Sequence, residues 1–453
     1  MKKILDWFSY TKEPELCLDL KARNIKALQI TAAVCWLIMV AAQLIIFFRF
    51  DGPQLSDSAG YLKNANECLA QGLLYPSPLN LYNHYIQGSG IVNLLLLIYQ
   101  FTDSLKPFFA INILLVQLLL FSCIYILKKI FKDSTIHYWF TILFCLLATM
   151  WAEIANVRTE IPFTALCFCA VALLYSDRKF KSVGCGVLLA VANWVRPLGI
   201  VAIAACVFII IYKKDKFRHI LGIAASYVCI ILIIGGITAS NCGSFIYQST
   251  TLGYNLIMTA NDDADGSYTS EVFNEGMPGY IPPEKEKEMT YKDFDEYYKD
   301  ISIDWIKKNP VKYIMQTPKK LFYLYATETY ANSTMYNNEI NTSGISYIKG
   351  IAAKLTGNSA ERFYAADAIS CFNQGWYMMT LLLFVIGTVV MIKLKKWRGM
   401  LPLYIMMAGF TAVVVIIVGG ARYHFPMLPI ILMSASVAAQ YLTSKTGKKP
   451  KKD

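Results

Sequence analysis

Long apolar runs alternate with short polar stretches along most of the chain. Ten of these runs approach the roughly 20 residues that a helix needs to cross a bilayer. They cover residues 27–48, 108–127, 136–152, 160–176, 183–195, 197–212, 219–240, 371–392, 400–418 and 423–441. Only 16% of the 453 residues are charged, whereas a soluble domain carries about 25%. The pattern therefore predicts an all-α polytopic membrane protein with about ten transmembrane helices.

Two regions depart from this simple pattern. The apolar run 91–101 is too short to span a bilayer, and runs of this length are typical of interfacial or re-entrant helices. We expect it to lie in the membrane surface, within the loop that follows the first crossing. In residues 183–212, Pro197 interrupts the apolar pattern because proline removes a helical hydrogen bond. Two short helices that meet near Pro197 are expected there.

The basic residues predict the orientation. The formal charge is +12, and the lysines and arginines gather in short clusters between apolar runs. Such clusters are typical of cytoplasmic loops, so they indicate membrane topology and not a nucleic-acid-binding surface. They lie within residues 2–26, 128–132, 178–181, 213–218, 393–398 and 445–452. If all are cytoplasmic, the protein is a multi-pass cell-membrane protein with both termini in the cytoplasm.

This topology divides the chain into predicted parts. A cytoplasmic N-terminus (1–26) precedes a transmembrane core (27–240) that includes the first outer loop (49–107). A large, mainly helical extracytoplasmic loop (241–370) follows, then the C-terminal transmembrane helices (371–441) and a cytoplasmic basic tail (442–453).

The first outer loop carries the residue around which the functional hypothesis is built. Asp57 follows the first apolar run closely, one position after Ser56, which is a good N-cap residue. Apolar residues then recur at helical spacing, at Ala59, Leu62, Ala65 and Leu69. This predicts a short interfacial helix with Asp57 in its first turn, where the helix dipole favours a charged carboxylate. Simple capping of a surface helix is the alternative interpretation of Asp57.

Several other ionisable residues stand at the predicted outer ends of helices. Charged groups at membrane depth are costly, so they tend to be functional or paired with one another. These residues are Arg158, Glu160, Arg196 and Arg422. Pairing or snorkelling explains any one of them equally well, but together with Asp57 they converge on one predicted face. No CxxC pair, His–Cys cluster or EF-hand spacing occurs, so the sequence predicts no zinc or calcium site.

With these residues placed, the chain resembles the GT-C superfamily of integral-membrane glycosyltransferases. The likeness is greatest to the bacterial branch near protein O-mannosyltransferases and the lipid A aminoarabinose transferase, in glycosyltransferase family 39. It covers most of the chain and rests on short motifs that share an order and a side of the membrane. They are Ser56-Asp57-Ser58 with Tyr61, Arg158-Thr-Glu160-Ile-Pro162, Arg196-Pro197 and Arg422-Tyr-His424-Phe-Pro426.

The resemblance implies a function and roles for residues. Such enzymes pass a sugar from a polyprenyl-phosphate carrier to an acceptor on the non-cytoplasmic side, usually with inversion. By likeness, Asp57 is the base on the acceptor hydroxyl, and Glu160 is the second acidic residue that positions acceptor or metal. Also by likeness, a group of cationic side chains would neutralise the leaving phosphate. This group consists of Arg158, Arg196, Lys320, Arg422 and His424. Tyr61 and His84 would position substrate.

The chain also departs from the family pattern. Many relatives carry two adjacent acidic residues in the first loop, whereas Ser58 follows Asp57 here. A His-Pro-Pro run is also missing, since the chain has Asn83-His84-Tyr85. These departures favour an enzyme that needs no cofactor, with a divalent cation at Asp57 and Glu160 as the alternative. The expected partners are a polyprenyl-phosphate sugar, the membrane and a lipid, glycan or protein acceptor, with no nucleic acid.

Other function classes fit some of the same residues. An O-antigen-type polymerase or ligase also uses outward arginines and a large outer loop. A lipid-sugar transporter is less consistent, because internal repeats and broken helices at the bilayer midplane would be expected. The position of Asp57 directly after the first helix favours the transferase.

Overall fold

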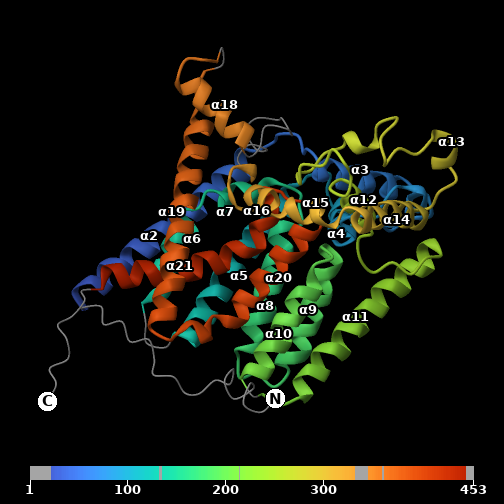
Figure 1. The fold of residues 1–453 in the computed structure, drawn as a ribbon. Coiled ribbons are helices and arrows are strands. Elements are labelled where there is room, and N and C mark those ends of the chain that lie inside the picture. The colour runs from blue at the N-terminus through green and yellow to red at the C-terminus, as the bar shows by residue number, and fades with distance from the viewer. Residues whose placement is uncertain (1–21, 132–134, 214, 332–344, 360–361, 445–453) are drawn as a thin grey trace.

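A computed structural model describes residues 22–131, 135–213, 215–331, 345–359 and 362–444 (Figure 1). Most of the predicted cytoplasmic N-terminus and nearly all of the predicted basic tail lie outside the described residues. Within the described residues every regular element is a helix, apart from an isolated bridge between Ser267 and Gly419. The predicted all-helical class is therefore confirmed for this part of the chain.

The main helices form a bundle in which one end carries most of the long connections. The helices of the bundle are α2 (Ala22–Arg49), α5 (Lys106–Ile130), α6 (Ile136–Cys145), α7 (Thr149–Ala152), α8 (Glu160–Leu174), α9 (Lys181–Val195), α10 (Gly199–Tyr212), α11 (Arg218–Cys242), α19 (Ala365–Lys393), α20 (Leu401–Ile416) and α21 (Leu428–Thr443). The remaining elements are α3 (Asp57–Ala70), η1 (Pro78–Tyr82), α4 (Ser89–Tyr99), η2 (Glu153–Ala155), α12 (Leu252–Ile257), η3 (Glu271–Phe273), α13 (Pro283–Glu286), α14 (Tyr291–Lys308), α15 (Pro310–Met315), α16 (Thr317–Tyr325), α18 (Ile345–Leu355), η5 (Trp397–Gly399) and η6 (Ala421–Met427).

The helix lengths refine the predicted number of crossings. Five helical stretches are long and apolar enough to span a bilayer: Ile25–Arg49, Lys106–Ile130, Arg218–Cys242, Ala365–Lys393 and Ala421–Thr443. A sixth candidate, Ile136–Cys145 with Thr149–Ala155, is bent by 65°. The other four predicted crossings are the shorter helices α8, α9, α10 and α20. A helix of 15 residues such as α8 is roughly 22 Å long, against about 30 Å of hydrocarbon. By length and composition, the helices indicate a multi-pass membrane protein with five or six spans.

The centre of the bundle is α21. Its residues from Leu428 to Gln440 are all buried, as expected for a helix that is apolar on every side. It packs against α19 and α6, and the contact with α19 is close because Gly387 has no side chain. A Cβ at Gly387 would lie 1.9 Å from the carbonyl oxygen of Ser434. By contrast α11 lies at the edge of the bundle (Figure 1), where most of its surface is exposed.

One end of the bundle carries the basic clusters, and we call it the lysine end. Lys129 in the last turn of α5 pairs with Asp177, which follows α8, and Lys181 of α9 pairs with Asp215 after α10. The end of α5 also contacts η5, since a Cβ at Gly399 would lie 2.8 Å from Ile130. The clusters at 128–131, 178–181, 213–218 and 393–398 therefore share one end. Which side of a membrane this end faces stays a prediction.

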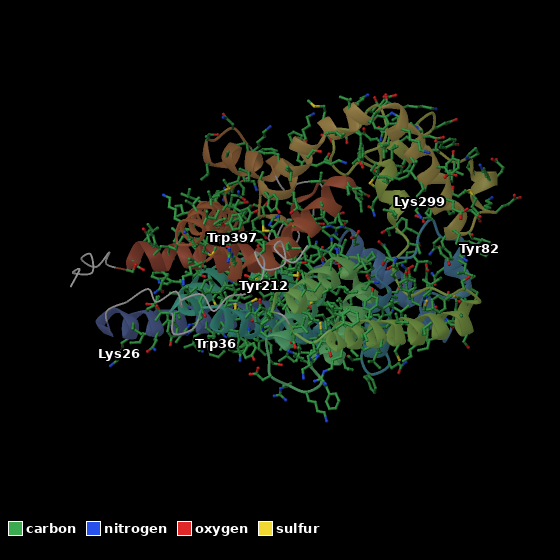
Figure 2. All side chains as sticks on the ribbon, turned by 60° about the horizontal axis from the view of Figure 1, so that its bottom comes forward. Lys26, Trp36, Tyr82, Tyr212, Lys299 and Trp397 are labelled. Carbon is green, nitrogen blue, oxygen red and sulfur yellow. The ribbon has the colours of Figure 1, made fainter. Side chains whose placement is uncertain are left out.

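The opposite end, which we call the loop end, is covered by the two predicted loops folded into one layer. The segment between α2 and α5 meets the segment after α11 through paired hydrogen bonds, Ile86 N to Thr250 Oγ1 at 2.9 Å and Thr250 N to Ile86 O at 2.7 Å. This layer has its own small core around Ile257, Phe294 and Tyr298. In Figure 2, Lys26 near the start of α2 and Lys299 of α14 lie at opposite ends of the molecule.

The loop layer contains short helices of its own. The short run 91–101 forms α4, which packs against α3 and α9. The helix α14 buries Phe294 and Tyr298 on one face and ends at Lys308, and α15 begins at Pro310, since proline is well tolerated in the first turn of a helix.

Candidate functional site

A cavity of about 170 Å³ lies at the loop end, between the bundle and the loop layer. Its walls come from α3, the segment 85–88, α8, the turn after α9, the segment 249–268, α20 and η6. Five of the nine predicted site residues line it: Asp57, Tyr61, Glu160, Arg196 and Arg422. The other four lie elsewhere and are described below.

Asp57 is the first residue of α3, as the spacing predicted. Ser56 occupies the N-cap position but its side chain makes no capping hydrogen bond. Its φ is 56°, in the region that favours glycine, so the backbone just before Asp57 is strained. Oδ2 of Asp57 accepts a hydrogen bond from Nη2 of Arg422 at 2.7 Å. Burial opposes the charge on Asp57, but the Arg422 guanidinium outweighs it and holds the pKa of the carboxyl below its ordinary value.

A second ion pair stands across the cavity. Glu160 is the first residue of α8, and its Oε1 accepts a hydrogen bond from Nη1 of Arg196 at 3.2 Å. Arg196 follows the last residue of α9 in extended conformation, and the Arg196-Pro197 step ends that helix. Both residues are positioned by helix ends, which hold them more rigidly than a free loop would.

Tyr423 separates the two arginines of the cavity. The centre of its ring lies 5.1 Å from the guanidinium carbon of Arg422 and 5.2 Å from that of Arg196. Each guanidinium has five N–H donors, and bonds to described residues use one nitrogen of each. Two arginines with remaining donors toward one cavity form a geometry that suits a phosphate.

Tyr61 closes the floor of the cavity. It is buried, and burial with the nearby Asp57 carboxylate raises its pKa, so the phenol stays neutral and able to donate a hydrogen bond. Its ring packs directly on Gly88, where a Cβ would come within 2.4 Å of the ring. Gly88 also has φ 58°, so both space and backbone conformation require glycine there.

The remaining walls differ in character. One wall carries aromatic and hydroxyl side chains: Tyr85, Tyr254, Tyr268, Ser249 and Thr251, with the amides Gln87 and Asn255. Another part of the lining is aliphatic, with Val413 and Val414 in the last turn of α20 and Ile417 and Val418 directly after it. Sequence reasoning missed the aromatic wall, because its residues come from separate loops and no short motif marks them. The pairing of a polar wall with an aliphatic wall fits an amphipathic ligand.

Behind the cavity lies a second layer of buried charges. Arg158 Nη1 contacts Glu153 Oε2 at 3.2 Å, and the guanidinium carbon of Arg158 lies 4.4 Å from the ring centre of Tyr330. Glu153 was missed from the sequence, although a carboxylate directly after an apolar run was a usable signal. Arg158 does not line the cavity, so its predicted role on a phosphate would act from behind Arg422 and Glu160.

His424 also points away from the cavity. Its Nε2 contacts the carboxylate of Glu328, and its Nδ1 lies 2.6 Å from the carbonyl oxygen of Leu324. Glu328 Oε1 in turn accepts a hydrogen bond from Thr149 at 2.6 Å. Both ring nitrogens of His424 are therefore engaged with buried partners, two residues along the chain from Arg422. Its predicted role on the donor phosphate stays a prediction that these contacts do not favour.

Two more predicted residues lie in the loop layer. Lys320 of α16 is buried, and its Nζ donates to Thr259 Oγ1 at 3.2 Å and to the Ile417 carbonyl oxygen at 3.3 Å. Burial lowers the pKa of Lys320 to about 8. His84 Nε2 lies 3.2 Å from Glu286 Oε1, outside the cavity lining. In these positions Lys320 and His84 connect parts of the loop layer.

The side chains around the cavity also indicate how well it could bind a metal ion. Among the described residues, no group of three or more His, Cys, Asp or Glu side chains could hold one. Asp57 and Glu160 each carry an arginine partner already, so a cation there would compete with a guanidinium.

No protein-family model, curated protein or solved structure matches the chain.

Proposed function

We propose that the chain is an integral-membrane glycosyltransferase of the GT-C type. It would take a sugar from a polyprenyl-phosphate donor and pass it to a lipid, glycan or protein acceptor on the extracytoplasmic side. The observation that carries this proposal is the loop-end cavity, where Asp57 and Glu160 stand beside the paired guanidinium groups of Arg422 and Arg196. The motif resemblance rests on these same four residues and supports the same function.

The proposed reaction is a displacement at the anomeric carbon of the sugar. The acceptor oxygen forms the new bond to this carbon while the bond to the phosphate oxygen breaks, which inverts the centre. The acceptor proton passes to the carboxylate of Asp57. The charge that develops on the leaving phosphate is stabilised by Arg422 and Arg196, and such preorganised donors contribute strongly to catalysis.

Asp57 needs a way to become a useful base. Its pairing with Arg422 keeps its pKa low, and a carboxylate of low pKa takes a proton weakly. A donor phosphate would draw Arg422 toward itself, because a guanidinium binds phosphate through several hydrogen bonds. Donor binding would then release Asp57 and raise its pKa. In this scheme the base becomes active only when the sugar donor is in place.

The different cavity walls would orient the bound sugar donor. The aromatic and hydroxyl residues around Tyr254 suit the faces and hydroxyls of a sugar. The aliphatic end of α20 would lie against the first carbons of the lipid carrier, at the edge of the apolar bundle. The phosphate then falls between these walls, within reach of the arginines.

The test is sugar transfer by the purified full chain in detergent. A panel of polyprenyl-phosphate monosaccharides is offered with a mixture of lipid, glycan and peptide acceptors, with and without EDTA. We expect one donor to turn over and Asp57→Asn to lower its rate by about 10²–10⁴-fold, the usual contribution of a general base. Asp177→Asn, which removes an exposed carboxylate at the lysine end, is the matched control.

Each outcome has a defined meaning. Full activity in Asp57→Asn would refute the proposed base. Loss of turnover with EDTA would place a divalent cation at Asp57 and Glu160. No transfer from any monosaccharide carrier, together with binding of long diphosphate-linked glycans, would favour a polymerase or ligase. Movement of a lipid-linked sugar across vesicles without transfer would favour a transporter.

A further inference from the structure

A second cavity, of about 250 Å³, lies between α4, α9 and the loop end of α11. Most of its lining is hydrocarbon. Its walls carry Leu74, Tyr75, Leu96, Leu97, Trp194, Ile234 and Ile237, with Asn93, Gln100, Thr238 and Asn241 among them. None of these residues belongs to the lining of the first cavity.

Three polar residues in these walls, Asn93, Thr238 and Asn241, have hydrogen-bond partners in the protein, whereas the indole Nε1 of Trp194 is buried without a partner among the described residues. Asn93 Nδ2 donates to the carbonyl oxygens of Tyr75 and Ser89, at 2.6 and 2.9 Å. Asn241 Nδ2 donates to the carbonyl oxygens of Leu74 and Pro76, at 2.8 and 2.5 Å. These bonds hold the chain around residue 75 in place. Apart from the indole N–H of Trp194 and the side-chain amide of Gln100, the cavity offers few donors or acceptors for a sugar or an ion.

The mouth of the cavity lies beside half-exposed apolar side chains of two helices. Leu97 of α4 and Ile237 of α11 line it, and about half of each side chain is exposed, 54% and 50%. α11 is one of the candidate membrane spans and the least buried of them, because only 11% of its apolar stretch is buried inside the protein. A helix of this kind faces lipid chains along most of its length.

We propose that this cavity binds the hydrocarbon chain of a membrane lipid. An apolar cavity of about 150 Å³ stays dry and takes a molecule such as benzene, so a larger one with a mouth in the bilayer takes a chain from it. Close packing is the normal condition of protein interiors, and a lipid chain supplies it here. The proposal stands on the cavity alone and does not depend on the proposed glycosyl transfer.

The bound chain would also support the first cavity. Trp194 lines the second cavity, while the next residues, Val195 and Arg196, line the first. On the other side, the Tyr75 hydroxyl accepts a hydrogen bond from the backbone N–H of Gln87 at 3.1 Å, and Gln87 lines the first cavity. One layer of residues therefore separates the two cavities, and a lipid chain would brace this layer from behind.

The experiment fills the mouth of the cavity. The full chain is purified in mild detergent and its bound lipids are counted by native mass spectrometry. Ile237→Trp should lower lipid occupancy by about tenfold or more, because the indole takes the space of the chain. Leu97→Trp, from the opposite wall, should do the same. Leu232→Trp, on the other face of α11 and 58% exposed, should retain the lipid.

The source of the chain is then identified on delipidated protein. One titration uses a diacyl phosphatidylglycerol and the other a polyprenyl phosphate, each with the unaltered chain and with Ile237→Trp. Saturable binding of either lipid, lost in Ile237→Trp, supports the proposal and names the chain. Equal lipid occupancy in Ile237→Trp and Leu232→Trp, with both proteins monodisperse and unchanged in thermal unfolding, would overturn it. So would a dimer without bound lipid, since a second copy would then cover the mouth.

Discussion

The two ends of the helix bundle handle charge in different ways. At the lysine end, the ion pairs of the described residues use lysine or histidine, and Asp177 is 97% exposed. At the loop end, lysine and histidine also form ion pairs, such as Lys106–Asp51 and His84–Glu286, but three further pairs use arginine and surround or back a cavity. These pairs are Asp57–Arg422, Glu160–Arg196 and Glu153–Arg158. Lysine suits a mobile contact with water, whereas arginine holds a fixed fork of donors.

This difference separates charges that set the orientation in a membrane from charges that are placed to bind a ligand. A charge pair that reaches water costs little, and its contribution to stability is small. Burying a pair costs desolvation that its attraction repays only with good geometry. The loop end carries that cost three times around one cavity. A binding or catalytic role for the loop end explains why these pairs are retained, and the predictions below test the contrast.

The largest effect is expected from removing one charge of the most buried pair. Glu153 and Arg158 have side chains 4% and 2% exposed, so Glu153→Gln leaves a buried guanidinium without its carboxylate. We expect a loss of about 3–5 kcal/mol in unfolding free energy. Asp177→Asn at the lysine end should leave the unfolding free energy nearly unchanged, because this pair is exposed to solvent. Denaturation in mixed micelles measures both, and equal losses would remove the distinction between the ends.

The next effect concerns the shape of a cation and not its charge. Arg422→Lys keeps the positive charge but loses the fork that meets Asp57 and, in the proposed reaction, the phosphate. We expect transfer to fall by about 10²–10³-fold, as for loss of one oxyanion donor. The reciprocal change at the other end, Lys181→Arg, should leave activity within about twofold because that pair only joins helix ends. Steady-state rates with one donor decide this, and an active Arg422→Lys protein would mean that charge alone suffices.

A smaller and more specific effect is expected in the pH dependence. In the free protein Arg422 holds the pKa of Asp57 below its ordinary value, so the carboxylate protonates only at low pH. If the donor phosphate draws Arg422 away, the pKa of Asp57 is higher in the complex. Both kcat and kcat/KM fall as pH falls through the relevant pKa. The acid limb of kcat should therefore lie at higher pH than that of kcat/KM. Coincident limbs would show that Arg422 stays on Asp57 throughout.

The sequence predicted correctly which helix ends lie together, but it predicted the directions of their side chains less well. Asp57, Glu160, Arg196 and Arg422 converge because the apolar runs fix which helix ends lie together. His424 was grouped with Arg422 by motif, yet the two lie in η6, a 3₁₀ segment with about three residues per turn. Residues two apart in such a segment point about 120° from each other. Only one of them can face the cavity.

Other features depended on packing that a single sequence does not encode locally. The aromatic wall contains Tyr85 and Tyr254, whose ring centres lie 4.5 Å apart. Along the chain, however, the helices α5 to α11 lie between these two residues. The helices α8, α10 and α20 are also shorter than the predicted runs 160–176, 197–212 and 400–418, whereas α9 begins at Lys181, before the predicted run 183–195. Hydropathy marks where a chain is apolar and does not mark where the helix stops.

The smallest expected effects come from two backbone positions, one at each end. Among the described residues, Ser56 and Lys395 are the non-glycine residues with positive φ, at 56° and 55°. Lys395 follows the end of α19, where its N–H and that of Lys396 bond back to Ile392 and Met391. This is the position where helices commonly place glycine. Lys395→Gly should therefore stabilise the protein by about 1 kcal/mol and leave transfer unchanged.

Ser56→Gly removes the same kind of strain from the residue that precedes Asp57, so a similar gain in stability is expected. Here the gain should have a functional cost, because a glycine at this step lets the start of α3 move and loosens the position of Asp57. We expect transfer to fall by about three- to tenfold while donor binding is kept, since a shift of the reacting group lowers the rate more than the affinity. Thermal unfolding and single-turnover rates of both variants measure the pair of effects. Equal activity in Ser56→Gly and Lys395→Gly would mean that Arg422 alone fixes Asp57 and that the strain at Ser56 has no catalytic role.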